Sequence, residues 1–101
     1  METLEFPYLV LRRTRQEIPV PAIIKSDGTA EYMDTPTDLK DLQEAVGGFI
    51  ERVSIPALPG MVMIVNEEGV ICRLPLNPVA SEIAGRLIVG DVVLMEKEEE
   101  Q

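Results

Sequence analysis

Proline and glycine divide this chain into short segments, and their positions limit which segments can become helix or strand. Pro19 and Pro21 flank Val20. Because proline has no amide hydrogen to donate to a sheet ladder, a central strand cannot begin before about Ala22. Pro75 ends a later apolar segment for the same reason. We therefore expect a fold of short elements joined by turns.

The first half of the chain predicts a β-hairpin. Two short segments, 22–25 and 29–33, flank the sequence Ser26-Asp27-Gly28. An Asp-Gly pair supplies the positive φ angles that tight hairpin turns require. Upstream, residues 9–11 form a short apolar segment that fits another strand.

The second half predicts further strands. Residues 49–55 place Phe49, Val53 and Ile55 on one face. Residues 61–65 are apolar throughout, as expected for a strand buried on both faces. Residues 66–69 then turn the chain, so that 70–74 returns as its hairpin partner. The last strand is expected over 87–95, with a bulge or bend at Gly90.

Two helices are predicted between these strands. Thr35-Pro36 is typical of a helix start, and Leu39, Leu42 and Val46 follow on one face until Gly47 ends the helix, which predicts a helix over residues 36–46. Asn77-Pro78 opens a second, shorter helix that runs to Gly85.

Together these elements predict one α+β domain. We expect a mostly antiparallel sheet of about five or six strands, with both helices packed on one face. The 101 residues leave room for a single core. The predicted domain spans residues 20–95, after an N-terminal extension over 1–19 and before a disordered acidic tail over 96–101.

The charge of the chain restricts its partners. There are 18 acidic and 9 basic residues, for a formal net charge of −9. Such a chain is repelled by phosphates and by anionic membranes, so we expect no direct nucleic-acid binding and no membrane. The charge suits a basic protein surface, although it also simply keeps a small protein in solution.

Several residue types needed for catalysis are missing. The chain has no histidine and a single cysteine, so it lacks the commonest general base and any internal disulfide. Cys72 lies in a predicted apolar strand, which indicates a buried, inert thiol. No glycine-rich phosphate loop, signal peptide or membrane-length apolar run is present. We expect a cytoplasmic protein that is not an enzyme and needs no cofactor or metal.

A few charged residues are candidate ligand or partner contacts. Glu67 and Glu68 could hold a hard cation or act as acid and base, unless they only form a solvated turn. Arg73 interrupts a predicted apolar strand and could bind a carboxylate or phosphate, unless it occupies an exposed edge. Arg12, Arg13 and Arg15 could contact an acidic partner, or could cover the domain's own acidic surface.

Four stretches in order carry a family resemblance, namely residues 42–51, 65–69, 74–77 and 88–92. With them the chain resembles a family called domain of unknown function 3846, met largely in bacteriophages and other mobile elements. The resemblance implies a phage accessory protein and supplies no catalytic residues. Its shared polar positions are also those that turns and helix caps need; they are Asn66, Glu67, Gly69 and Asn77.

The leading hypothesis is therefore a small phage accessory protein that binds and modulates a host protein, such as a defence or transcription component. One alternative is an oligomer that sequesters a nucleotide signal, with Arg12, Arg13, Arg15 and Arg73 as phosphate contacts. Others are an acidic mimic of DNA and a structural component of the virion. Exposed strand edges leave a homo-oligomer open.

Overall fold

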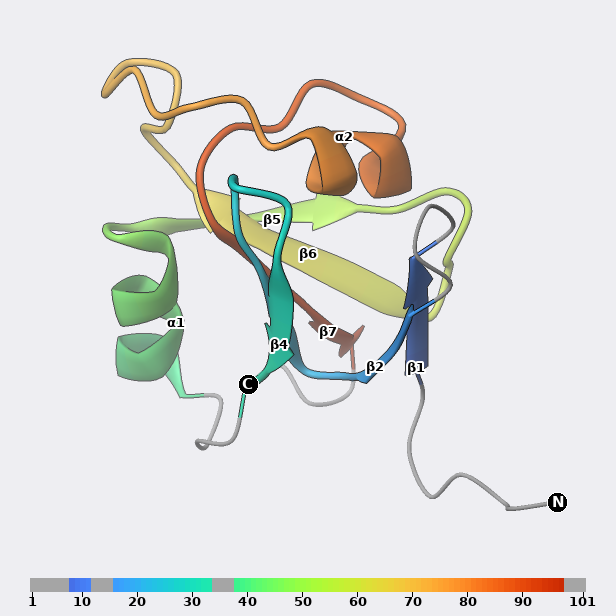
Figure 1. The fold of residues 1–101 in the computed structure, drawn as a ribbon. Coiled ribbons are helices and arrows are strands. Elements are labelled where there is room, and N and C mark those ends of the chain that lie inside the picture. Colours follow the sequence, from blue (N-terminus) through green and yellow to red (C-terminus); the bar gives the residue numbers. More distant parts are fainter. Residues whose placement is uncertain (1–7, 12–15, 34–37, 98–101) are drawn as a thin grey trace, which may run out of the picture.

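The computed structural model describes residues 8–11, 16–33 and 38–97, and its main feature is a five-stranded sheet (Figure 1). The sheet order is β4-β3-β7-β6-β5, and every neighbouring pair is antiparallel. The α+β class and the antiparallel sheet are thus confirmed. The strands are β3 (Ala22–Ile24), β4 (Ala30–Tyr32), β5 (Ile50–Ser54), β6 (Met61–Asn66) and β7 (Val92–Glu96).

Three further pieces complete the described fold. Strands β1 (Tyr8–Leu11) and β2 (Gln16–Pro19) pair only with each other, as a separate antiparallel ribbon. Helix α1 (Leu39–Val46) connects β4 to β5, and helix α2 (Pro78–Ala84) lies between β6 and β7. No helix in the described ranges is long and apolar enough to cross a membrane.

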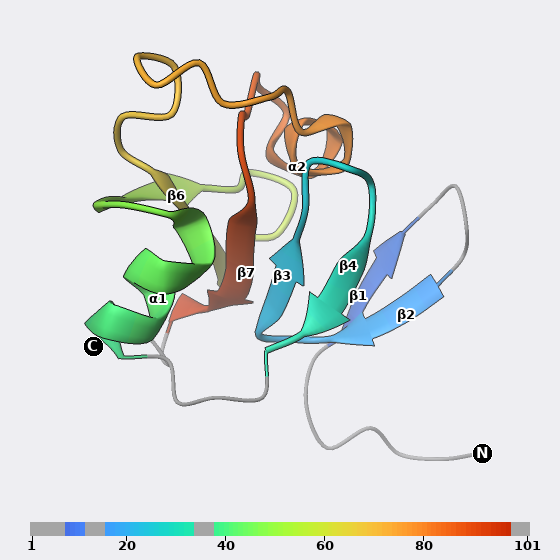
Figure 2. The ribbon, with the colours of Figure 1, turned by 60° about the vertical axis from the view of Figure 1, so that its left-hand side comes forward.

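The two helices pack on opposite faces of the sheet, so the expectation of one shared face was wrong. Both views place the strands between them (Figures 1 and 2). Strands β6 and β7 are apolar at consecutive positions, and consecutive side chains point to opposite faces. Each face therefore needs its own cover. The core under α1 contains Met33, Leu42, Val46, Val62, Ile64, Val93 and Met95, whereas the core beside α2 includes Ala22, Ile24, Val53, Met63, Val65, Ala80, Ala84, Val92 and Leu94.

Helix α1 is bounded by polar and glycine caps. The Asp38 carboxylate accepts a hydrogen bond from the Asp41 amide at 2.9 Å, which makes Asp38 the N-cap. Gly47, with φ 81°, ends the helix in the left-handed region, as predicted. The predicted cap, Thr35, lies outside the described residues. Leu39, expected on the buried face, is exposed at the first position of the helix.

Asn77 caps helix α2, as predicted, and also joins three parts of the fold. Its side-chain oxygen accepts from the Ala80 amide at 3.0 Å. Its side-chain nitrogen donates to the carbonyl of Ile24 at 3.0 Å and to that of Gly90 at 2.8 Å. The side chain is completely buried and its polar atoms are paired, as a buried amide must be. Asn77 therefore fixes α2 to β3 and to the segment that enters β7.

The turn between β3 and β4, which we call the polar turn (residues 25–29), confirms the predicted hairpin. The Lys25 amide donates to the Thr29 carbonyl at 2.8 Å, and Gly28 has φ 94°. The Asp27 carboxylate accepts from both the hydroxyl and the amide of Thr29, at 2.6 and 2.9 Å. These hydrogen bonds, the hydroxyl first, hold the pKa of Asp27 below its ordinary value.

Two predicted strands differ in the structure. Residues 70–74 do not pair with β6; they form a turn on the surface. The last strand begins at Val92 rather than at residue 87, because Gly90 adopts φ 78° and turns the chain into it. Glu96, assigned to the tail, is the final residue of β7, while residues 98–101 lie outside the described ranges.

Candidate functional site

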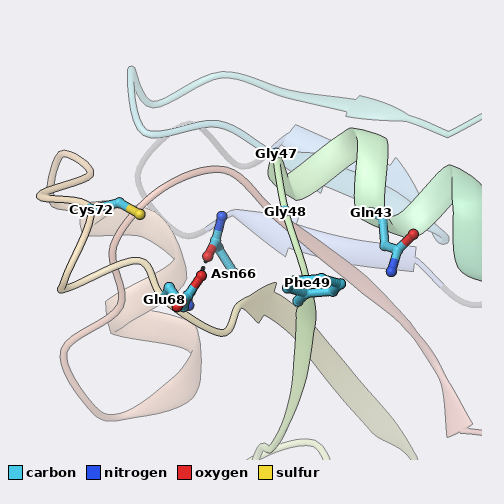
Figure 3. A pocket seen from close by; sticks show the side chains of 7 residues that line it. All are labelled: Gln43, Gly47, Gly48, Phe49, Asn66, Glu68 and Cys72. Carbon is cyan, nitrogen blue, oxygen red and sulfur yellow. Dashed lines mark hydrogen bonds between the residues drawn. The ribbon is translucent and has the colours of Figure 1, made fainter.

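The candidate site lies where β6 ends, close to the C-terminal end of α1. Asn66, the last residue of β6, donates from its side-chain nitrogen to the carbonyl of Val46 at 3.1 Å. Its side-chain oxygen accepts from the Glu68 amide at 2.8 Å, as drawn in Figure 3. A Cβ on Gly48 would lie 2.9 Å from the Asn66 nitrogen, so a larger residue there would displace the Asn66 amide. Asn66 thus couples the end of the helix to the turn that follows β6.

Residues 68–74, which we call the apolar turn, form a single turn of helix. The Cys72 amide donates to the carbonyl of Glu68 at 2.8 Å. The turn ends with the two hydrogen bonds of a Schellman motif, from Leu74 to Gly69 at 2.9 Å and from Arg73 to Val70 at 3.1 Å. Arg73 occupies the left-handed position of that motif with φ 56°, where glycine is the usual residue. The backbone of the turn is therefore held in one conformation.

Leu74 anchors the base of the apolar turn. A Cβ at Gly69 would lie 3.6 Å from a terminal carbon of Leu74, and a Cβ at Gly90 only 2.7 Å from the same atom. The Gly90 amide also donates to the carbonyl of Pro75 at 2.7 Å. Leu74 thus packs against backbone on both sides, which fixes the turn to the segment that enters β7.

The tip of this turn is apolar and exposed. Val70 and Ile71 are 75% and 79% exposed, although single exposed apolar side chains are common on any protein surface. Val70 and Ile71 are neighbours on one surface turn, and contiguous exposed apolar groups are a feature of interaction surfaces. The tip is therefore the first part of the candidate site.

The second part is a depression of about 300 Å³ beside the turn (Figure 3). Its lining combines one aromatic ring, one carboxylate and two amides, and consists of Gln43, Gly47, Gly48, Phe49, Asn66, Glu68 and Cys72. Phe49 is 66% exposed, unlike Val53 and Ile55, which were predicted to lie on the same face and are buried. Glu68 and Cys72 belong to both the depression and the apolar turn.

The predicted contact residues are separated in the structure. Glu68 lines the depression, whereas its neighbour Glu67 is exposed and does not. Arg73 lies in the apolar turn instead of a strand, because residues 70–74 close on themselves rather than on β6. Arg12, Arg13 and Arg15 lie outside the described residues.

Cys72 is exposed, so the prediction of a buried thiol was also wrong. That prediction followed from the predicted strand, and Cys72 lies in a surface turn instead. Within the described ranges, no three His, Cys, Asp or Glu side chains come together as a metal-binding group.

Sequence reasoning missed three contributors to the site, namely Gln43, Phe49 and the Val70–Ile71 tip. The signal for Phe49 was its position directly after Gly47-Gly48, since a residue leaving a helix end need not follow the alternation of the strand after it. The signal for the tip was Gly69, because glycine in a turn often marks a close approach of the backbone. Gln43 carried no signal beyond its polar position on α1.

Comparison with known families identifies the chain. A domain of unknown function (DUF3846) matches residues 20–101, which is most of the chain, and the chain belongs to that family. Comparison with curated proteins and with solved structures gives no significant match.

Proposed function

We propose that this chain is a small, non-catalytic bacteriophage accessory protein that binds a host protein and modulates it. The observation that carries the proposal is the tip of the apolar turn, where Val70 and Ile71 are exposed on a backbone that is already fixed. An apolar anchor held in place before binding loses little entropy when a partner covers it. In protein interfaces a few central side chains that become fully covered contribute most of the binding free energy.

The phage setting and the kind of partner rest on the family. The resemblance described above implies a phage or mobile-element accessory protein, and a component of host defence or transcription is the partner we expect. This protein acts in the cytoplasm of the infected cell.

Binding rather than catalysis is supported by the residues available at the site. Cys72 is exposed, but the sequence contains no histidine to accept its proton. A nucleophile without a neighbouring base is poorly activated. Glu68 is the only carboxylate among the seven residues that line the depression, so the paired carboxylates of acid–base chemistry are not found there.

The alternative of a nucleotide-sequestering oligomer has less support. The depression is the natural place for a small ligand, yet its lining includes Glu68 and neither lysine nor arginine. A phosphate there would face a carboxylate of the same sign. Native mass spectrometry of the protein purified from bacteria separates the two hypotheses, because an oligomer with a bound small molecule favours sequestration and a bare monomer favours a protein partner.

Affinity capture from bacterial lysate, followed by reconstitution with the purified partner, tests the proposal. We expect the double variant Val70→Ser/Ile71→Ser to weaken the reconstituted complex by about 100-fold, as loss of a central apolar anchor does. Leu87→Ser is the matched control, because Leu87 is 71% exposed and lies outside the turn and the depression. The proposal fails if repeated captures recover no specific partner, or if the double variant and the control bind equally well.

A further inference from the structure

The depression beside the apolar turn is lined partly by polar and charged side chains, unlike the apolar tip formed by Val70 and Ile71. The residues that line it include Phe49, Glu68 and Gln43, whose aromatic ring, carboxylate and amide interact favourably with a cation. Figure 3 shows these side chains arising from three different segments, namely helix α1, the residue directly before β5 and the apolar turn.

The three groups are available for a ligand. Phe49 exposes 66% of its surface, so its ring is open to solvent. Within the described residues, neither the Glu68 carboxylate nor the Gln43 amide takes part in a hydrogen bond or ion pair. Asn66 is different, because both ends of its amide are already bonded. Asn66 therefore shapes the depression, while Gln43, Phe49 and Glu68 remain to contact a ligand.

The residues around the depression are also mostly acidic, so they carry a net negative charge. Glu67 is exposed next to Glu68. Helix α1 and its N-cap carry three acidic residues, Asp38, Asp41 and Glu44, against one basic residue, Lys40. The pKa of Asp41 is raised, first by partial loss of its water and then by its interactions with the carboxylates of Asp38 and Glu44. Arg73 is the only basic residue of the apolar turn. A cation approaching this end of the molecule is attracted, and an anion is repelled.

We propose that the depression receives an arginine side chain of the partner protein, with the guanidinium on the Phe49 ring and paired with the Glu68 carboxylate. Arginine fits better than lysine, because its flat guanidinium stacks on an aromatic ring and donates two parallel hydrogen bonds to a carboxylate. The Gln43 carbonyl is the third acceptor. This inference rests on the proposed function and adds to it the charge of the partner surface, which is an arginine placed beside the apolar pocket that covers Val70 and Ile71.

A second copy of the chain is a weaker occupant. In a two-fold symmetric dimer the same patch meets itself, so Glu67 and Glu68 of one copy would face those of the other. Each copy also carries a net charge of −9, which opposes association.

The test uses the full chain labelled with ¹⁵N and two small probes, Nα-acetyl-arginine amide and its uncharged analogue Nα-acetyl-citrulline amide. We expect the arginine probe to shift the amide signals of Gly48, Phe49, Glu68 and Cys72, with a Kd on the order of 10 mM. The citrulline probe has nearly the same shape without the charge, and we expect it to bind at least about 10-fold more weakly.

Matched variants locate the binding. Glu68→Gln and Phe49→Leu should each weaken binding of the arginine probe by about 5-fold or more, whereas Glu67→Gln, outside the lining, should weaken it by less than about 2-fold. Phe49, Glu67 and Glu68 are all exposed, so we expect each variant to keep the spectrum of the folded protein. Equal shifts with citrulline, or equal binding by Glu67→Gln and Glu68→Gln, would overturn the inference. Shifts of the same amides on concentration without any probe would also overturn it, in favour of a second copy.

Different results would contradict the proposed function and the proposed arginine site. If capture depends on Val70 and Ile71 but the arginine probe does not bind, the proposed function stands and the arginine site is wrong. If the arginine probe binds as expected but no partner is captured, the proposed function is wrong.

Discussion

Two surface turns of this protein are both closed by backbone hydrogen bonds, but one exposes polar side chains and the other apolar ones. The polar turn between β3 and β4 is closed by backbone hydrogen bonds and by the Asp27 carboxylate, and its exposed side chains are polar. The apolar turn after β6 is also closed by backbone bonds, yet it presents Val70 and Ile71 to solvent. The first turn thus reverses the chain with polar side chains in water, whereas the second leaves two apolar side chains exposed.

The two turns also differ in how they accommodate the left-handed conformation. The polar turn uses Gly28, which has open space around it, while the apolar turn places Arg73 in that region. The apolar turn is then supported from below by Leu74 against Gly90. Non-glycine residues held in the left-handed region cluster at functional sites.

The largest change in stability is expected on replacing a glycine, with Gly90 at the base of the apolar turn compared with Gly28 in the polar turn. Gly90→Ala should reduce the free energy of unfolding by about 3 kcal/mol, because the alanine must adopt a positive φ and also collides with Leu74. Gly28→Ala has the same conformational penalty but meets no atom within 4 Å, so about 1 kcal/mol is expected. Urea unfolding of both variants measures the difference, and equal losses would show that Leu74 does not press on Gly90.

A smaller change in the free energy of unfolding, in the stabilising direction, is expected on replacing Arg73. Arg73→Gly should stabilise the fold by about 0.5 kcal/mol, because glycine adopts a positive φ without strain and the gain exceeds its entropy loss. Arg73→Ala keeps the strain and serves as the control, with no gain expected. If both variants lose stability in thermal unfolding, the arginine side chain itself supports the turn.

The tip of the apolar turn should contribute almost nothing to stability. Val70→Ser/Ile71→Ser should change the free energy of unfolding by less than about 0.5 kcal/mol, because both side chains are exposed in the folded protein. Leu74→Ala in the same turn should lose about 2 kcal/mol. Urea denaturation of the two variants side by side distinguishes a binding tip from a structural one, and a large loss in the serine variant would contradict the assignment.

The smallest effect concerns ionisation in the polar turn. Thr29→Val removes the hydroxyl donor, so the pKa of Asp27 should rise toward its ordinary value, while Thr29→Ser should leave it low. Because the folded pKa of Asp27 is depressed, its contribution to stability is present above the ordinary value and is lost as the pH falls. NMR titration of the Asp27 carboxyl measures the change, and an unaltered pKa in the valine variant would assign the effect to the backbone amide.

The sequence predicted correctly those helices and strands that have a clear local pattern, such as regular apolar spacing, a capping residue before proline or a continuous apolar run. The spacing of Leu42 and Val46, the Asn77-Pro78 start and the apolar run at 61–65 all correspond to the structure. The two-sided burial predicted for 61–65 already implied a cover on each face, but the helices were assigned to one. Which face a helix covers depends on the chain's path through space, and local periodicity does not determine it.

The candidate site was predicted only in part, because a strand and an exposed turn can share one pattern. Val70, Cys72 and Leu74 alternate as a strand would, and nothing local distinguishes pairing with β6 from closure at Arg73. Glu68 was identified from its residue type alone. The depression needs Gln43, Phe49 and Glu68 together, and only the tertiary fold brings those three residues into one place.

The position of β7 in the middle of the sheet has a consequence for how the protein folds. Before β7 is added, β3 pairs only with β4 and β5 pairs only with β6, so the chain holds two unconnected hairpins. Those hairpins are joined when the last strand of the sheet enters between them, and isolated hairpins are marginal in water. We therefore expect the core to assemble late and cooperatively, when residues 92–96 join the two hairpins. Gly90 lies just before these residues, so its contact with Leu74 at the base of the apolar turn should form in the same step.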